Sequence, residues 1–248
     1  MKILIGSIIV RFVNSMKKTI KKYLRKIKYH FVSEKQKESN FYKKLFIENE
    51  HWNTPKPNEE EVLRWEIIKD FLSNIKKDDE NVDILDLGSG RGWLTNLLAN
   101  YGNVVGVEPV KSVVGYSRTM FPNIKFICGT SKTLIRGKNF KKYDLIVTSE
   151  VIEHIPDHSK ESFIEDISKL LNEKGFLIIT TPRKEVEEQW KAYIGPNQPV
   201  EDWITEKELE ELVLKKHFST LRLERFGIPP MFNVPDIEIY QLWLFQKK

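Results

Sequence analysis

The stretch Val82-Asp83-Ile84-Leu85-Asp86-Leu87-Gly88-Ser89-Gly90-Arg91-Gly92 decides the fold of this chain. It begins as a short apolar run, ends with glycine at every second position, and is followed by residues 93–99, which have helical spacing. This order predicts a strand, a glycine turn and a helix. Glycines allow a bound ligand to approach the bare backbone, and the helix directs its free N–H groups and positive dipole end at that ligand. The stretch therefore predicts a nucleotide-like binding site.

The glycine spacing separates two kinds of nucleotide site. Dinucleotide folds use GxGxxG to hold a pyrophosphate at the helix start, whereas this chain has DxGxGxG from Asp86 to Gly92. The pattern resembles motif I of the class I S-adenosylmethionine (SAM) methyltransferases, in which the turn receives the amino acid part of SAM. The alternative is a tight turn of the kind found in any α/β protein. The resemblance implies SAM as the cofactor.

Strand-like and helix-like segments alternate from residue 82 onward, which predicts an α/β fold with a largely parallel sheet between helices. The resemblance implies a Rossmann-like, seven-stranded, mostly parallel sheet of order 3-2-1-4-5-7-6, with the last strand antiparallel. A helix is expected over residues 206–216, with Thr205 and Glu208 as its capping box. The strands expected after the first span residues 104–107, 123–128, 143–149, 176–180, 221–226 and 237–245.

The positive charge of the chain is unevenly distributed. Its 248 residues carry a formal net charge of +5, but residues 1–30 hold nine Lys or Arg and no acid. The remainder has 31 basic against 35 acidic residues, so we expect no nucleic-acid partner. The single cysteine, Cys128, excludes a disulfide framework and suits a reducing compartment. Its apolar neighbours predict a thiol buried on a strand.

Three segments are expected: a basic amphipathic extension over residues 1–32, a helical cap over 33–75, and the methyltransferase domain over 76–248. The apolar residues 3–13 are too few to span a membrane and are interrupted by an arginine. Residues 16–31 then place apolar side chains on one side of a helix and lysines on the other. Such a helix binds an anionic membrane surface, or packs on its own domain or a partner. We expect a cytoplasmic protein that is peripheral at the membrane.

The cap segment contains four aromatic residues before a helix that is expected over residues 59–73, with Asn58 as its N-cap. Residues 51–58 contain two prolines and predict an ordered loop. The resemblance implies that the cap closes the SAM pocket; alternatively, its aromatic side chains simply cover the sheet. The four aromatic residues are Phe41, Tyr42, Phe46 and Trp52.

Glu108 ends the second expected strand and is the strongest single cofactor residue in the sequence. Its two carboxylate oxygens can accept both hydroxyls of a ribose, which no neutral side chain reproduces. The alternative is an exposed acid at a strand end. Many relatives have an acid after the third strand for the adenine amino group, where this chain has Gly129-Thr130-Ser131. The expected cofactor contacts are Asp86, Gly88, Ser89, Gly90, Gly92, Trp93, Glu108, Pro109, Thr130, Ser131, Ser149 and Glu150.

The segment that follows the fourth expected strand, residues 149–157, reads SEVIEHIPD. It resembles the corresponding motif of methyltransferases that modify ubiquinone precursors and other small metabolites. Ligands of α/β sheets bind beyond the carboxyl ends of the strands, where this motif lies. His154 is the candidate base for a hydroxyl acceptor, with Glu150 as a second catalytic candidate. The alternative for His154 is a structural imidazole that bonds the backbone.

The same residues also fit a metal-dependent methyltransferase. Glu150, Glu153 and His154 also resemble the ExxEH metal motif of small-RNA 3′-end 2′-O-methyltransferases, and carboxylates with imidazole are plausible metal ligands. The further histidine of that family has no convincing counterpart, because His158 is expected at a helix start and His217 within a helix. We therefore expect no metal ligands here.

Residues 183–203 form a long segment that is expected to be irregular, and such loops within compact domains are usually functional. We interpret it as a lid on the acceptor side; alternatively, its aromatic residues anchor the loop. The expected acceptor contacts are Trp52, Trp190, Tyr193 and Trp203.

The sequence thus predicts a SAM-dependent methyltransferase that acts on a hydroxyl, or an amine, of a small-molecule, glycan or lipid-linked acceptor. The first alternative is the metal-dependent RNA enzyme. The second is a SAM-binding scaffold protein without catalysis. Stimulation by manganese would indicate the former, and SAM binding without turnover would indicate the latter.

Overall fold

The computed structural model describes residues 34–75, 82–138, 140–193, 199–228 and 236–248. The chain divides into two compact units, residues 1–40 and 41–248. Of the first unit only the beginning of helix α2 (Glu34–Lys43) is described, so the expected extension over residues 1–32 lies outside the described residues. The second unit holds the sheet and all the site residues considered below.

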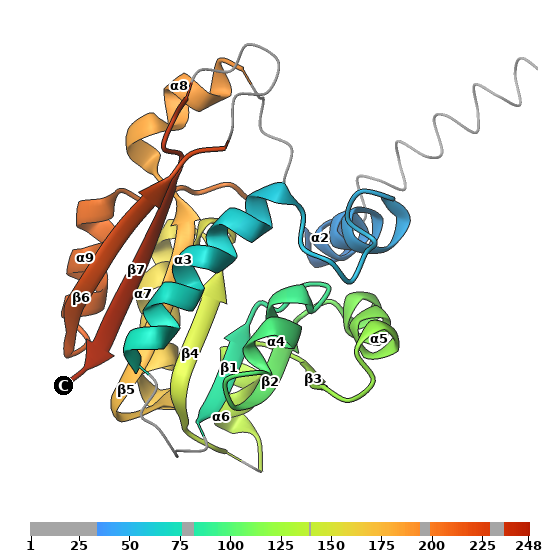
Figure 1. The fold of residues 1–248 in the computed structure, drawn as a ribbon, viewed down its shortest axis with the longest axis horizontal. Coiled ribbons are helices and arrows are strands. Elements are labelled where there is room, and N and C mark those ends of the chain that lie inside the picture. Colours follow the sequence, from blue (N-terminus) through green and yellow to red (C-terminus); the bar gives the residue numbers. More distant parts are fainter. Residues whose placement is uncertain (1–33, 76–81, 139, 194–198, 229–235) are drawn as a thin grey trace, which may run out of the picture. The chain divides into compact units, whose positions relative to one another are not determined.

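The second unit is built on one seven-stranded sheet with the order β3-β2-β1-β4-β5-β7-β6 (Figure 1). This confirms the expected Rossmann-like architecture. Strands β1 to β5 pair in parallel, whereas β7 runs antiparallel to both β5 and β6. The strands are β1 (Asp83–Leu87), β2 (Asn103–Glu108), β3 (Lys125–Cys128), β4 (Tyr143–Ser149), β5 (Leu171–Pro182), β6 (Phe218–Phe226) and β7 (Tyr240–Lys247).

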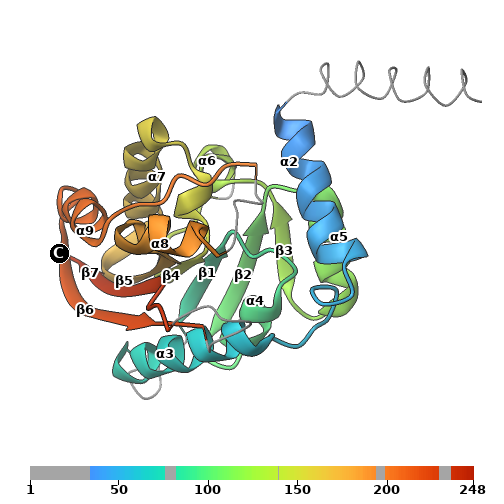
Figure 2. The same ribbon diagram turned by 90° about the horizontal axis from the view of Figure 1, so that it is seen from above.

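Helices cover both faces of this sheet (Figure 2). Successive strand residues point to opposite faces, so Ile84 packs with α3 and α4 while its neighbour Leu85 packs with α7 and α9. Burial on both faces explains why the central strands are almost continuously apolar. The helical elements after α2 are the π-helix Lys44–Glu48, α3 (Glu59–Ile75), α4 (Trp93–Leu98), α5 (Lys111–Met120), α6 (Ser131–Arg136), the 3₁₀ turn Ile152–His154, α7 (Asp157–Leu170), the 3₁₀ turn Lys184–Val186, α8 (Glu187–Lys191) and α9 (Glu206–Leu214).

The expected helix caps are confirmed. At the start of α3, the Glu61 N–H donates to Asn58 Oδ1 at 2.9 Å, and the Asn58 N–H donates back to Glu61 Oε2 at 2.8 Å. At the start of α9, Thr205 and Glu208 form the expected capping box. Among the described residues, no helix combines the length and the apolar character needed to cross a bilayer.

Some local expectations were wrong. Cys128 is exposed rather than buried, because β3 is an edge strand whose last residue faces outward. His217 lies beyond the end of α9, in a left-handed backbone conformation with φ 65°, and not within a helix. The segment over residues 183–203 is not wholly irregular, because it contains α8. The first two errors concern the edge of the sheet and the end of a helix, where local sequence patterns are weakest.

Candidate functional site

The glycine turn follows β1 at the carboxyl end of the parallel strands. Gly88, Gly90 and Gly92 all have left-handed backbone conformations, with φ of 88°, 49° and 91°. At Gly88 an added Cβ would lie only 2.2 Å from Val151 Cγ2, so a side chain there is excluded by space as well as by conformation. At Gly92 the corresponding atom would lie 2.7 Å from the Phe126 ring. The turn needs glycine for both reasons.

Glu108 lies at the tip of β2, beside this turn. The backbone N–H of Gly90 donates to its Oε2 at 3.2 Å, and that of Val110 donates to its Oε1 at 2.8 Å. These bonds hold the carboxylate next to the glycines. The position suits the expected contact with two ribose hydroxyls.

Asp86 is buried below the turn. Thr95 Oγ1, on α4, donates to Asp86 Oδ2 at 2.5 Å. Burial raises the pKa of the Asp86 carboxyl to about 7, and the hydrogen bonds from Thr95 oppose that shift. The carboxyl therefore links β1 to α4 and titrates near neutrality.

The residues of the turn fit SAM. Ser89 is 5% exposed, and within the described part of the chain its hydroxyl has no hydrogen-bond partner. A buried polar atom without a partner is unfavourable unless a ligand satisfies it. The unpartnered hydroxyl, the glycines and the Glu108 carboxylate are all features of one strand–turn–helix connection. Of the other expected contacts, Trp93 is buried in the core, and Pro109 accepts a weak bond from the exposed Cys128.

Thr130 and Ser131 open α6 after β3. Thr130 caps this helix together with Thr133, and the buried Ser131 hydroxyl donates to Asp166 Oδ2 at 2.8 Å. Both hydroxyls therefore already have protein partners. An adenine contact in this region would depend on the main chain.

Glu150 follows β4 and is held in a strained conformation, with φ 56°. Thr180 Oγ1 donates to its Oε1 at 2.9 Å, while Arg64 approaches its Oε2 at 3.5 Å. Thr180 Oγ1 also lies 2.9 Å from the Ser149 hydroxyl. Burial raises the pKa of Glu150 to about 8, against the opposing attraction of Arg64. The carboxyl is thus mostly protonated near pH 7.

The His154 imidazole is hydrogen-bonded to the chain through Nδ1. Nδ1 lies 2.8 Å from the carbonyl oxygen of Val200, and Nε2 lies 3.6 Å from Glu153 Oε1. Thr181 Oγ1 donates to the other carboxyl oxygen of Glu153 at 3.0 Å. Burial raises the pKa of Glu153 to about 7. Because a carbonyl only accepts, Nδ1 carries the hydrogen and Nε2 holds the lone pair of the neutral ring.

Glu150, Glu153 and His154 do not converge on one point. In the part of the chain that is described, no group of three or more His, Cys, Asp or Glu residues is placed to hold a metal ion. Glu150 faces Arg64 and Thr180, whereas Glu153 faces Thr181 and the imidazole.

Arg64, on α3, was missed by the sequence reasoning. It is 3% exposed, donates to Glu60 at 2.6 Å, and lies with its guanidinium carbon 4.8 Å from the centre of the Tyr240 ring. Its position beside Glu150 joins the cap to the segment after β4. No local pattern distinguishes this arginine from the solvated cations on other helices.

Arg91, within the glycine motif, was also missed. It is 1% exposed and makes two bonds to the Glu61 carboxylate, at 2.6 and 2.7 Å. It also donates to the backbone carbonyls of Thr54 and Lys56, at 2.9 and 3.0 Å. This arginine clamp, defined here as Arg91 with Glu61, Thr54 and Lys56, fastens the cap loop to the turn.

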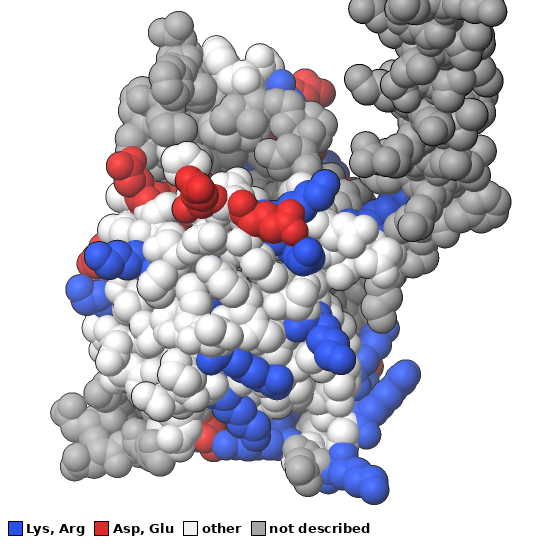
Figure 3. Space-filling model, turned by 90° about the vertical axis from the view of Figure 1, so that its right-hand side faces the viewer, with Lys and Arg blue, Asp and Glu red and all other residues white. Residues whose placement is uncertain are grey.

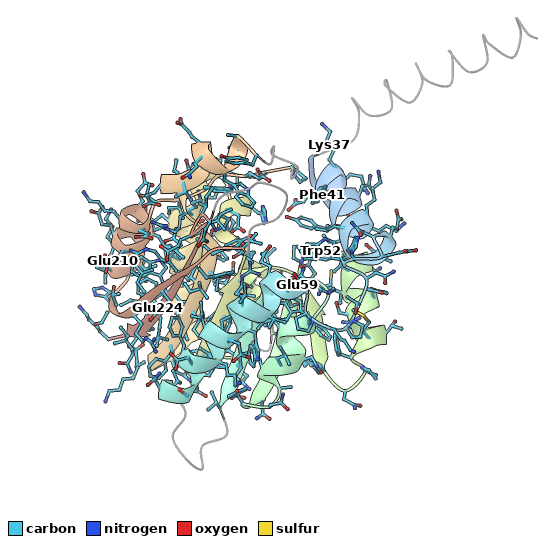
Figure 4. All side chains as sticks on the ribbon, turned by 45° about the horizontal axis from the view of Figure 1, so that its top comes forward. Lys37, Phe41, Trp52, Glu59, Glu210 and Glu224 are labelled. Carbon is cyan, nitrogen blue, oxygen red and sulfur yellow. The ribbon has the colours of Figure 1, made fainter. Side chains whose placement is uncertain are left out.

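The cap aromatics lie over the site. The Phe46 ring is 3.3 Å from the position of a Cβ added to Gly90, and the Tyr42 ring centre is 6.0 Å from that of His154. Trp52, labelled in Figure 4 between Phe41 and the start of α3, stacks its ring 5.5 Å from the Arg91 guanidinium. These side chains contact the turn, His154 and Arg91.

The remaining expected acceptor contacts differ in burial. Trp203 is 6% exposed and belongs to the core, which agrees with the alternative that it anchors the segment. Trp190 packs partly against the same core. Tyr193 is 50% exposed and is the one of these three that is open to solvent.

Comparison with known families and proteins identifies relatives of this chain. A family model described as a methyltransferase domain matches residues 59–223. The ubiquinone biosynthesis O-methyltransferase of Pelagibacter ubique (strain HTCC1062) is 27% identical over 189 residues, which cover 70% of this chain and 75% of that protein. The mitochondrial ubiquinone biosynthesis O-methyltransferase of Rattus norvegicus is 34% identical over 110 residues, but these cover only 41% of this chain and 31% of the rat protein.

Solved structures share the fold. The N-methyltransferase NodS from Bradyrhizobium japonicum WM9, in complex with S-adenosyl-L-homocysteine (SAH), has a TM-score of 0.62 and 16% identity, and the match covers 84% of this chain and 98% of NodS. Magnesium protoporphyrin IX methyltransferase from Synechocystis PCC 6803 with bound SAM has a TM-score of 0.61 and 14% identity, over 88% of this chain and 98% of that one. Together with the family model, these matches support SAM as the cofactor.

Removing the arginine clamp should destabilise the fold and loosen the cap. R91M leaves the Glu61 carboxylate buried without its partner, so we expect the free energy of unfolding to fall by about 3 kcal/mol in urea titrations. The double variant R91M/E61M should recover part of this loss, because neither charge is then left alone. In both variants, limited proteolysis of residues 49–57 should accelerate.

The matched control is K69M, which removes an exposed pair with Glu66 and should cost less than about 0.5 kcal/mol. If R91M proved no more destabilising than K69M, the clamp would have no structural importance.

Asp86 should make the fold less stable as pH rises. Its ordinary pKa is 3.8 and its pKa in the fold is about 7, so between these values the folded state binds more protons than the unfolded state. The free energy of unfolding therefore falls as the pH rises through this interval. D86N mimics the protonated form, so its stability should fall less steeply between pH 4.5 and pH 7 in urea titrations. Equal slopes for the two proteins would contradict the shift.

Proposed function

The chain belongs to the methyltransferase domain family, and from this premise we propose that it transfers the methyl group of SAM to a hydroxyl group, or to an amine, of a small-molecule acceptor. The observation that carries the proposal is the imidazole of His154, held by Val200 with its Nε2 lone pair beside Glu153. The Pelagibacter relative is named an O-methyltransferase, which favours the hydroxyl, while the solved NodS is an N-methyltransferase.

The turn and Glu108 would hold the cofactor. The glycine backbone would receive its amino acid part, and the Glu108 carboxylate would accept the ribose hydroxyls. When bound, SAM supplies a methyl group that its sulfonium already activates. The task left to the protein is to align the acceptor and to remove its proton.

His154 is proposed as the base. Its Nδ1–H donates to the Val200 carbonyl, which fixes the ring and leaves Nε2 as the nitrogen that takes the proton from the acceptor hydroxyl. The ring becomes positively charged on accepting the proton, and an ionised Glu153 carboxylate 3.6 Å away stabilises that charge.

Glu150 is proposed to position the acceptor. Because its pKa is about 8, it carries a proton near pH 7 and can donate a hydrogen bond to an acceptor oxygen. Its strained backbone is of the kind that is retained at functional sites. Glycan and lipid-linked acceptors present the same hydroxyl chemistry, and the cap and residues 183–203 would select among them.

Membrane-surface binding through residues 1–32 is a separate proposal, and so is the cytoplasmic location. The membrane proposal rests on the basic, amphipathic sequence of that extension. Binding of the full chain to anionic vesicles, with unchanged SAM affinity but weaker vesicle binding after deletion of residues 1–32, would support it. Equal vesicle binding by both forms would remove it.

Two substitutions at His154 separate a base from a structural imidazole. H154N keeps a side-chain donor for the Val200 carbonyl but has no nitrogen that takes a proton, whereas H154A removes both functions. If His154 is the base, both variants should lose about 10²- to 10⁴-fold in kcat. Methyl transfer is measured with methyl-labelled SAM on a panel of catechols, aliphatic alcohols and primary amines.

SAH binding should be unchanged in both variants, which provides the control for folding. Near-normal kcat in H154N with loss in H154A would contradict the base and show that the imidazole only fixes the loop.

A further inference from the structure

One stretch of the second unit is basic throughout. Residues 109–143 contain eight Lys or Arg and no Asp or Glu. They form α5, β3, α6 and the connection into β4, at one edge of the sheet. Figure 3 shows the face that carries α5 and β3, on which Lys and Arg side chains gather over the lower part while Asp and Glu form a band above. The basic character is therefore local, although the chain after residue 30 has more acids than bases.

An exposed aromatic side chain lies within this basic stretch. Phe140 is 46% exposed and follows Lys138 and precedes Lys141 and Lys142. Single exposed apolar side chains are ordinary on a protein surface, so it is the surroundings of Phe140 that distinguish it. Its ring lines a hollow of about 500 Å³, whose other lining residues are Ile135, Lys142, Ser168, Lys169 and Lys247. The hollow has apolar walls and three ammonium groups.

The charges that face the hollow come from three elements. Lys247 pairs with Glu173 at 2.8 Å, and Lys169 pairs with Glu165 at 2.6 Å. Lys169 and Glu165 are both about half exposed, so that pair contributes little. Lys247 is only 12% exposed and also donates to the carbonyl oxygens of Ser168 and Leu171, so its ammonium group is held in place at the wall of the hollow. Within the described residues, Lys142 makes no ion pair. Lys142 is an exposed cation whose attraction to Glu173 acts from beyond ion-pair distance.

The hollow lies at the opposite end of the sheet from the cofactor turn. Phe140 precedes the first residue of β4, Tyr143, whereas the glycine turn follows the last residue of β1, Leu87. These two strands are parallel neighbours, so the beginning of one strand and the end of the other lie at opposite ends of the sheet. A ligand in the hollow cannot be the acceptor of the methyl group.

We propose that the Phe140 hollow, defined by its six lining residues, binds the phosphate headgroup of an anionic phospholipid and docks the domain on a bilayer surface. Lysines near such a surface are attracted to its anionic headgroups, and the Phe140 ring would enter the boundary between headgroups and acyl chains. The apolar wall of Phe140 and Ile135 favours lipid over nucleic acid, whose phosphates would meet the lysines but leave that wall uncovered.

This docking fixes the orientation of the enzyme. With the beginnings of the parallel strands against the bilayer, the glycine turn and His154 face the aqueous side. A water-soluble acceptor would then reach the site without leaving solution. This consequence is independent of the identity of the acceptor and of the extension over residues 1–32.

Vesicle binding by the full chain tests the proposal. The variant F140S/K142E changes two exposed side chains of the hollow, and K207E/L221S makes the same chemical changes at two exposed positions elsewhere. Binding is measured by co-sedimentation with vesicles of phosphatidylcholine alone or mixed equally with phosphatidylglycerol. We expect binding to the mixed vesicles to fall at least about tenfold for F140S/K142E, to be unchanged for K207E/L221S, and to weaken with salt.

A label at the site provides a second measurement. In C128S/F140C, an environment-sensitive dye at position 140 should shift to the blue with mixed vesicles and not with phosphatidylcholine. Equal vesicle binding by F140S/K142E and K207E/L221S, or no dye shift, would overturn the proposal. The proposal would also be overturned if F140S/K142E lost binding of polyuridine RNA but kept its vesicle binding.

Discussion

The structure depends on one connection, in which the Glu108 carboxylate accepts hydrogen bonds from the backbone of Gly90 and Val110. The turn between β1 and α4 reaches this carboxylate only because three glycines take left-handed conformations. A Cβ at Gly88 would also collide with Val151, which belongs to the segment after β4. The same three glycines thus bring together the cofactor turn, the tip of β2 and the segment that carries His154. Backbone conformation, rather than any single side chain, assembles the site.

Buried charge completes this assembly. The cap is fastened to the turn by the ion pair of Arg91 and Glu61, and α3 carries a second pair, Arg64 with Glu60, beside Glu150 of the segment after β4. Burying ions is costly unless they are paired and hydrogen-bonded, so these pairs specify where the cap lies more than they stabilise the fold. The cap aromatic Phe46 lies against Gly90, so the cap contacts the turn directly.

The sequence predicted the architecture and SAM as the cofactor because both depend on local patterns. The glycine spacing and the carboxylate at the strand end can be recognised within short stretches of sequence, and Asn58 marks the start of its helix within four residues. The arginine partnerships could not be predicted in this way, since Arg91 and Glu61 are 30 residues apart and an arginine has the same local appearance whether solvated or buried. Cys128 was expected in the core because apolar neighbours indicate a strand, but they do not indicate that the strand lies at an edge. The tautomer of His154 depends on Val200, which is 46 residues away.

Calorimetric titration of the purified chain with SAM and with SAH tests the central claim most directly, when E108A is measured beside the parent protein. The account predicts heat for both ligands with the parent protein, and an affinity at least about tenfold weaker in E108A, because the ribose hydroxyls lose a charged acceptor. Circular dichroism of E108A should match that of the parent. The absence of heat with either ligand, or equal affinity of the two proteins, would contradict the assignment of this turn to the methyl donor.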